Sequence, residues 1–106
     1  MGEGRFKVIL SPHSLRDLEE IVRYIAADNP AAADRFGQRL INEAEAAGTH
    51  PLAGRVVPEF DEAAIRERIH RSYRIVYRVD ESRQIVVVSR FWHAARGTPD
   101  LPTDGE

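Results

Sequence analysis

The clearest strand signal in the chain is the run Ser72-Tyr73-Arg74-Ile75-Val76-Tyr77-Arg78-Val79. Apolar and polar side chains alternate along most of it, which is the period of a strand that packs one face on a core. The core face would carry Tyr73, Ile75, Tyr77 and Val79. The other face would carry Arg74 and Arg78, which is unusual for a plain core strand. A second strand run, residues 84–93, follows a short turn, so the sequence predicts a β-hairpin with cationic side chains.

Upstream of this hairpin the sequence predicts a strand over residues 5–10 and then two helices. Each helix begins with a polar residue followed by proline, a pattern that satisfies the first backbone N–H groups and fits the first turn. These pairs are Ser11-Pro12 and Asn29-Pro30. Apolar side chains recur at helical spacing after both starts, and Gly48 is typical of the residue just beyond a helix. The short connection predicts an antiparallel helical hairpin.

The remaining elements complete an α+β fold of order β-α-α-β-β-β. Residues 49–64 are punctuated by prolines and a glycine, and we interpret them as an ordered connecting loop before a strand at 65–71. The helical hairpin is expected to pack on one face of a mainly antiparallel sheet. The other face could then display four arginines, Arg66, Arg68, Arg74 and Arg78. Residues 1–98 are predicted to form a single domain, and residues 99–106 a frayed tail.

Composition limits the classes of function. The chain has 106 residues, a net charge of -2 and no cysteine, so thiolate metal sites are excluded and a reducing cytoplasm is the expected setting. No long apolar run predicts a secretory signal or a membrane span. The four histidines stand at no recognised metal spacing, and no phosphate loop is present, so we expect neither metal nor cofactor. Residues 55–96 hold nine arginines against six acids, which makes this the cationic part of a slightly acidic protein.

Taken together, several motifs resemble the ParE/RelE superfamily of bacterial type II toxin–antitoxin modules, which includes plasmid stabilisation system proteins. The resemblance covers Arg5 to about Leu101 and rests on the order and spacing of its pieces. These pieces are Ser14-Leu15-Arg16-Asp17-Leu18-Glu19-Glu20-Ile21, Asp28-Asn29-Pro30, Pro51-Leu52-Ala53-Gly54-Arg55, Ile65-Arg66-Glu67, the run from Tyr73 to Val79, and His93 with Arg96.

The resemblance implies a toxin that arrests growth unless a cognate antitoxin binds it in a hetero-oligomer. It implies two classes of target. Members similar to ParE inhibit DNA gyrase without acting as nucleases, whereas members similar to RelE cut messenger RNA on the ribosome. The long helical hairpin and the Tyr-Arg-Ile-Val-Tyr strand look closer to ParE. A third alternative is an inactive relative that serves as a binding module.

The candidate catalytic residues apply only if the protein is a nuclease. Arg74 matches the position at which RNA-cutting relatives hold the scissile phosphate, and His93 could shuttle protons near neutral pH. Tyr73 or Glu67 could assist them. The structural alternatives are an Arg74 paired with Glu67 or another acid, and a His93 that hydrogen-bonds to backbone and fixes the C-terminus.

The candidate binding residues follow from charge and from aromatic content. A pI of about 6.1 and a single lysine favour a protein target over ribosomal RNA. Guanidinium groups suit an acidic antitoxin segment that folds on binding. The arginines proposed for this contact are Arg66, Arg68, Arg74, Arg78 and Arg96. Phe91 and Trp92 should fall on opposite faces, and an exposed Trp92 would be a target contact, unless both rings are core.

Overall fold

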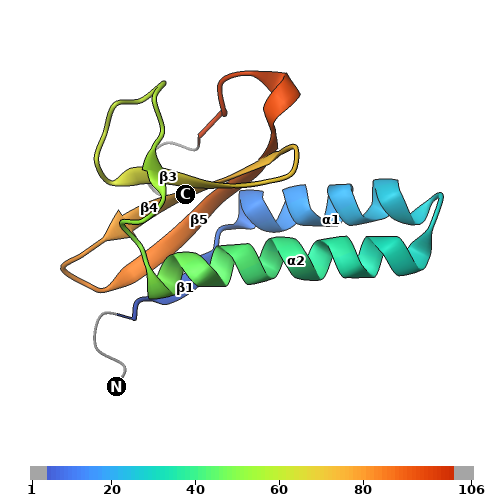
Figure 1. Cartoon of the computed structure of the whole chain (residues 1–106), viewed down its shortest axis with the longest axis horizontal. Helices are drawn as coiled ribbons and strands as arrows, with labels where there is room; N and C mark the ends of the chain where they lie inside the picture. Colours follow the sequence, from blue (N-terminus) through green and yellow to red (C-terminus); the bar gives the residue numbers. More distant parts are fainter. Residues whose placement is uncertain (1–4, 102–106) are drawn as a thin grey trace.

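The described part of the computed structural model, residues 5–101, has a helical hairpin on one side of a five-stranded sheet (Figure 1). The elements in chain order are β1 (Lys7–Leu10), α1 (Pro12–Ala26), α2 (Pro30–Thr49), β2 (Arg55–Val56), β3 (Ile65–His70), β4 (Tyr73–Asp80), β5 (Ile85–His93) and a 3-10 helix, η1 (Ala94–Arg96). The α+β class is confirmed. The region predicted as a plain loop, 49–64, also contains the two-residue strand β2.

Both helix starts form as predicted. Ser11 accepts a hydrogen bond from the Ser14 backbone N–H at 3.1 Å, and Asn29 accepts one from the Ala32 N–H at 3.1 Å. The assignment of Gly48 to the residue after α2 was wrong, because the helix continues to Thr49. A Cβ at Gly48 would lie 2.6 Å from the carbonyl oxygen of Phe6, so this glycine allows the chain just before β1 to approach the helix.

The sheet has the order β1-β5-β4-β3-β2. Strands β2 to β5 form an antiparallel meander, and β1 joins β5 in parallel with Lys7 opposite Ile85. The pairing of β4 with β5 shifts by one residue, because Val76 lies opposite Arg90 whereas Tyr77 lies opposite Val88. Ser89 is the extra residue of a β-bulge. Beyond it, the alternation of β5 side chains between the two faces of the sheet is shifted by one residue.

The main core lies between the sheet and the helical hairpin. It buries Leu40 and Ala44 of α2 against Ile75, Tyr77 and Phe91 of the sheet, with further contributions from both layers. The two helices also pack closely against each other, since a Cβ at Gly37 of α2 would lie 2.9 Å from a methyl of Val22 of α1. Burial of these apolar side chains supplies most of the favourable free energy of folding.

The second face of the sheet is covered by chain segments without helices or long strands. Val57, Ile65 and Val76 form a smaller apolar cluster there, and Phe60 and Leu101 pack against it. The segment from residue 99 to 101, which we predicted to fray, is therefore packed on the sheet. The rest of that predicted tail, residues 102–106, lies outside the described residues.

The prediction that four arginines share one open face was wrong. Cross-strand neighbours share a face of a sheet, and Arg66 and Arg68 lie opposite Tyr77 and Ile75, which belong to the helix-side core. Arg74 alternates with Ile75 along β4 and lies on the second face, as does Arg78. The register separates the pairs, because Ile65 lies opposite Arg78 and this pairing puts Arg66 and Arg68 on the helix side of the sheet.

Candidate functional site

Arg74 lies at the centre of a buried network of ion pairs. Its side chain donates to Glu59 through both terminal nitrogens at 2.8 and 2.9 Å, to Glu67 at 2.7 Å and to the Gly97 carbonyl at 3.2 Å. Glu67 is fully buried and also accepts from Arg55. With 7% of its surface exposed, Arg74 fits the structural alternative of an arginine paired with Glu67 and another acid.

These contacts change the acidity of the groups involved. The hydrogen bonds from Arg74 lower the pKa of Glu59 to about 2, because they favour the charged carboxylate. The same contacts with Glu59, and then those with Glu67, raise the pKa of Arg74 above its ordinary value despite burial. Both groups are therefore charged at neutral pH, and their charges compensate within the chain. The guanidinium has few donors left for a bound phosphate.

Trp92 lies on the second face, opposite Arg74, and 4% of its surface is exposed. Its ring nitrogen donates to the Gly97 carbonyl at 3.0 Å, and the guanidinium carbon of Arg96 lies 3.8 Å from the ring centroid. The expectation of an exposed ring was therefore wrong, and the alternative of two core rings fits. A role of Trp92 in target binding stays a prediction, and it would require displacing residues 96 and 97.

His93 lies on the helix side of the sheet, next to Tyr73 of β4 at a ring-centroid distance of 5.0 Å. Its Nδ1 accepts a hydrogen bond from the Ala95 N–H at 3.1 Å, which holds the start of η1, as the structural alternative proposed. His93 and Arg74 come from opposite faces, so the sheet separates the two candidate catalytic residues.

A shallow pocket of about 290 Å³ does lie beside His93. Arg96, Tyr73 and the highly exposed Tyr24 line it, and so do two carboxylates, Asp17 and Glu20. Asp17 is neutralised by Arg90, which donates to it twice at 2.7 and 2.8 Å, and it also accepts from the Phe91 N–H. Glu20 remains as a negative charge opposite Arg96. The pocket thus has little net positive charge with which to attract a phosphate.

The other arginines proposed for antitoxin contact are largely engaged within the chain. Arg66 donates to the carbonyls of Leu52, Gly54 and Ala63, and so holds the loop around β2. Arg68 pairs with Glu43 of α2 at 3.0 Å. Arg78 has only a loose pair with Glu62 at 3.8 Å and is half exposed. Of this set, Arg78 is the most available to a partner.

Three further arginines were not singled out by the sequence. Arg35 and Arg39 of α2 and Arg71 of the β3–β4 turn line one pocket of about 260 Å³ with Ile25, Ala32 and Phe36. The signal in the sequence was the spacing of Arg35 and Arg39, one helical turn apart. The contribution of Arg71 could not be read from the sequence, because it depends on where the turn lies over the helix.

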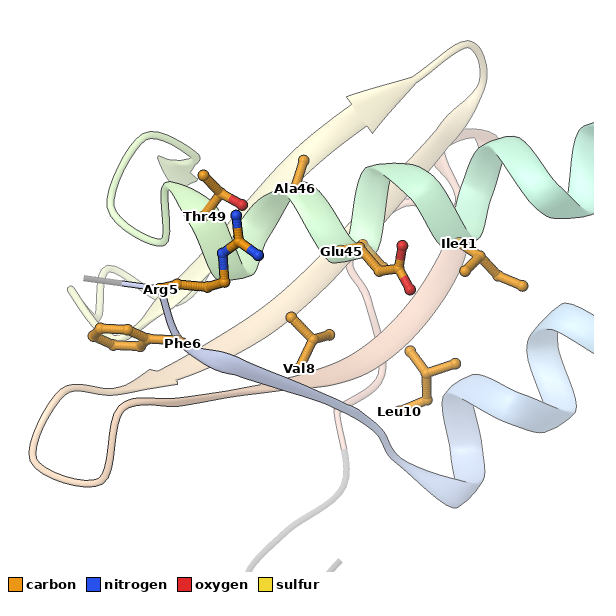
Figure 2. A pocket seen from close by; sticks show the side chains of 9 residues that line it. Arg5, Phe6, Val8, Leu10, Ile41, Glu45, Ala46 and Thr49 are labelled. Atoms are coloured by element: carbon orange, nitrogen blue, oxygen red, sulfur yellow. The ribbon is translucent and has the colours of Figure 1, made fainter. Parts of the chain in front are cut away.

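A larger pocket, of about 610 Å³, lies between β1 and α2 (Figure 2). Val8 and Leu10 project from β1 toward the helix, where Ile41 forms the facing wall, and Arg5 and Glu45 add one charge of each sign. Beyond β1 the sheet has no further strand among the described residues. A groove of mixed polar and apolar lining beside an open sheet edge is a suitable surface for an extended or helical peptide.

The fold and these surfaces define a small α+β domain whose central arginine is structural and whose grooves lie along its helical hairpin. The chain belongs to the family of ParE toxins of the type II toxin–antitoxin system parDE, whose model matches residues 8–97. Within residues 5–101, no helix has the length and apolar content needed to span a membrane.

Two solved structures have a similar fold. One is the chromosomal ParDE toxin–antitoxin system from P. aeruginosa, with a TM-score of 0.69 and 15% identity over 86% of this chain and 98% of that one. The other is the toxin–antitoxin complex RelBE2 from Mycobacterium tuberculosis, with a TM-score of 0.55 and 23% identity over 84% of this chain and 98% of that one. A search of curated proteins found no significant match.

Proposed function

We propose that this protein is a toxin that arrests growth by inhibiting DNA gyrase and that a cognate antitoxin neutralises it. Membership of the ParE family supports the toxin assignment. Similarity to a ParDE system and to a RelBE2 complex supports an antitoxin partner, with which the toxin would form a hetero-oligomer. The choice of gyrase over messenger RNA rests on the site itself.

The observation that carries this choice is the position of Arg74. Its guanidinium is buried between Glu59 and Glu67, on the face of the sheet opposite His93. A nuclease stabilises the charge that develops on the scissile phosphate with open, preorganised cationic donors beside its proton-transfer group. The pI of about 6.1 also suits a protein target better than a surface of RNA phosphates.

One pair of assays tests the proposal. Purified protein is added to a gyrase supercoiling reaction and, in parallel, to ribosomes that translate a defined message. We expect loss of supercoiling or accumulation of cleaved DNA, with the message intact. Cut message together with normal supercoiling would contradict the proposal.

The alternative of a ribosome-dependent endoribonuclease is favoured by one observation, the pocket that places Tyr73 and Arg96 beside His93. If this alternative holds, His93→Ala should slow cleavage about 100-fold, the usual effect of losing a general acid or base. Arg74→Ala is a poor test, because it would leave Glu67 buried with one fewer cation and cost about 3–5 kcal/mol of stability. An inactive relative would produce no growth arrest on expression.

We further propose that the antitoxin occupies the pocket between β1 and α2 (Figure 2). Its walls combine apolar side chains such as Val8, Leu10 and Ile41 with the polar side chains of Arg5, Glu45 and Thr49, so an amphipathic peptide would fit there. The outer edge of β1 offers backbone groups to an added strand, since β1 pairs with β5 alone among residues 5–101. Of the five arginines predicted to contact the antitoxin, Arg78 and Arg96 are exposed, but Arg78 lies on β4 and Arg96 on η1, away from this pocket.

A further inference from the structure

Three arginines of the described chain stand together without an internal partner. Arg35, Arg39 and Arg71 are exposed, and their side chains make no hydrogen bond or ion pair with any residue between 5 and 101. The more central arginines contrast with them, since Arg74 and Arg90 are each held by at least one carboxylate. The structure therefore leaves three guanidinium groups available at one place.

Their arrangement is unfavourable for the isolated chain. Arg35 and Arg39 are one turn apart on α2, where like charges destabilise a helix, and Arg71 adds a third positive charge to the same pocket. Arg71 also has φ of 55°, in the left-handed region that glycine or asparagine adopts at lower cost in a tight turn. No ion pair within residues 5–101 compensates for the repulsion among these three charges, whereas a bound anionic group would.

The pocket between these arginines has an apolar floor. Ile25, Ala32 and Phe36 line it, and the ring of Phe36 is fixed by contacts with His70 and Tyr73, both at centroid distances of 5.7 Å. Its volume of about 260 Å³ lies below the range of about 300–1,000 Å³ that is usual for small-molecule sites. A space of this size suits one apolar side chain of a ligand. The arginines at its rim would then pair with negative charges on either side of that ligand side chain.

We infer that this pocket binds an acidic peptide segment of a partner protein, in which carboxylates flank one apolar side chain. Guanidinium groups pair well with carboxylates, and the apolar floor gives the segment an anchor that a row of phosphates would not use. A nucleic acid is disfavoured by the pI of about 6.1 and the single lysine. The site takes residues 32–39 of α2, so it is separate from the pocket of Figure 2, which takes residues 41–49.

The test is a fluorescence anisotropy titration of the full chain with a labelled peptide, Asp-Glu-Leu-Glu-Asp. We expect saturable binding that weakens as salt is raised. Arg35→Gln, Arg39→Gln and Arg71→Gln should each weaken binding about three- to fivefold, which is typical of one exposed ion pair. Arg16→Gln, which changes an exposed arginine of α1 outside the pocket, is the matched control and should leave binding unchanged.

Further probes separate the chemistry of the ligand from charge alone. The neutral peptide Asn-Gln-Leu-Gln-Asn and a peptide with serine in place of leucine should both bind more weakly than the acidic peptide. Arg71→Gly should weaken binding as much as Arg71→Gln does, while its thermal unfolding temperature stays equal or rises, which separates damage to the site from damage to the fold. None of these measurements depends on gyrase or on an antitoxin, so they can fail while the proposed toxin function stands.

Three outcomes would overturn the inference. The first is no binding of the acidic peptide, and the second is an equal loss with Arg16→Gln and Arg35→Gln. The third is tighter binding of a short oligouridylate than of the acidic peptide at the same salt, abolished by the same three substitutions, which would assign the site to nucleic acid.

Discussion

Arg74 illustrates how a cationic side chain on the middle of a sheet can serve the fold. It joins three segments that are distant in sequence, since its partners are Glu67 on β3, Glu59 in the loop after β2, and the Gly97 carbonyl after η1. Each partner removes part of the cost of burying the charge. Arg74 therefore fixes the cover of the second sheet face, which is a structural task that needs no ligand.

The acid sensitivity of this network can be measured at Glu59. Its pKa is about 2 in the folded protein against an ordinary 4.5, so its contribution to stability is present above pH 4.5 and is lost as the pH falls toward 2. Glu59→Gln should lower the free energy of unfolding by about 1 kcal/mol at pH 7, the upper end for a partly exposed pair, and by less at acid pH. Urea unfolding across this range measures the difference.

Glu62→Gln is the matched control, since Glu62 lies in the same loop but has only the loose pair with Arg78. Its pH profile should run parallel to that of the unchanged protein. Parallel profiles for Glu59→Gln as well would show that the Arg74–Glu59 pair does not contribute to stability.

The contacts of individual residues could be predicted from the sequence only in part. The pairing of Arg74 with Glu67 was one of our two alternatives, because the two residues lie on neighbouring strands. Glu59 could not be assigned, since the path of an irregular loop sets its position. For the same reason the burial of Trp92 could not be decided, because the irregular segment after β5 covers its ring. The face on which Trp92 lies could not be assigned either, since alternation alone does not reveal the bulge at Ser89.

At the scale of elements, the segment after β5 is the cover of the second face. Trp92 and Arg74 both donate to the Gly97 carbonyl, Arg90 donates to the Asp100 carbonyl at 2.7 Å, and Leu101 packs on the cluster of Val57, Ile65 and Val76. We predicted fraying here from the prolines and glycine of the tail. The composition of the tail does not reveal that side chains of the sheet donate hydrogen bonds to the backbone carbonyls of this segment.

Leu101→Asp should loosen this cover, because it places a carboxylate against an apolar cluster. We expect a loss of about 1–2 kcal/mol in the free energy of unfolding. Trp92 is the only tryptophan of the chain, so its fluorescence should shift to the red and become more sensitive to a soluble quencher. Leu52→Asp, at an already exposed leucine, should change neither property. An unchanged Trp92 signal in Leu101→Asp would mean that Leu101 does not hold the cover in place.

The elements themselves were predictable where local chemistry determines them. The two Pro-containing helix starts and the alternating strands were found because capping and periodicity act over a few residues. The two-residue strand β2 was missed because it is too short to show a period. The parallel pairing of β1 with β5 was not specified by the pattern, because it depends on how the helical hairpin returns the chain across the sheet.

At the scale of the whole molecule, the sheet separates the pocket of Figure 2, which lies on the helix side, from the covered second face. Sequence indicated a cationic sheet face as the partner surface. The structure instead uses most of those arginines internally and leaves grooves along α2. Net charge along the chain was a poor guide, since it counts paired and unpaired arginines alike.

Ile41→Arg tests the proposed antitoxin surface. Ile41 forms the wall of the pocket that faces β1, and it lies outside both core clusters (Figure 2). We expect antitoxin binding to weaken at least tenfold, because the groove would lose apolar contact and gain an unpaired charge. Isothermal titration with the antitoxin encoded beside the toxin measures this. Asn42→Arg, on the exposed side of α2, is the control, and equal affinity for all three proteins would place the antitoxin elsewhere.

The pairing of β1 with β5 also bears on how the protein comes into being during synthesis. Lys7 is made well before its strand partner Ile85, because both long helices and three strands lie between them in the sequence. At about 5–20 residues per second, β1 waits several seconds for β5. A chain that terminates before residue 85 cannot pair β1 with β5 and cannot complete the main core. Chains that stop before β5 are therefore expected to stay unfolded and to be open to proteolysis.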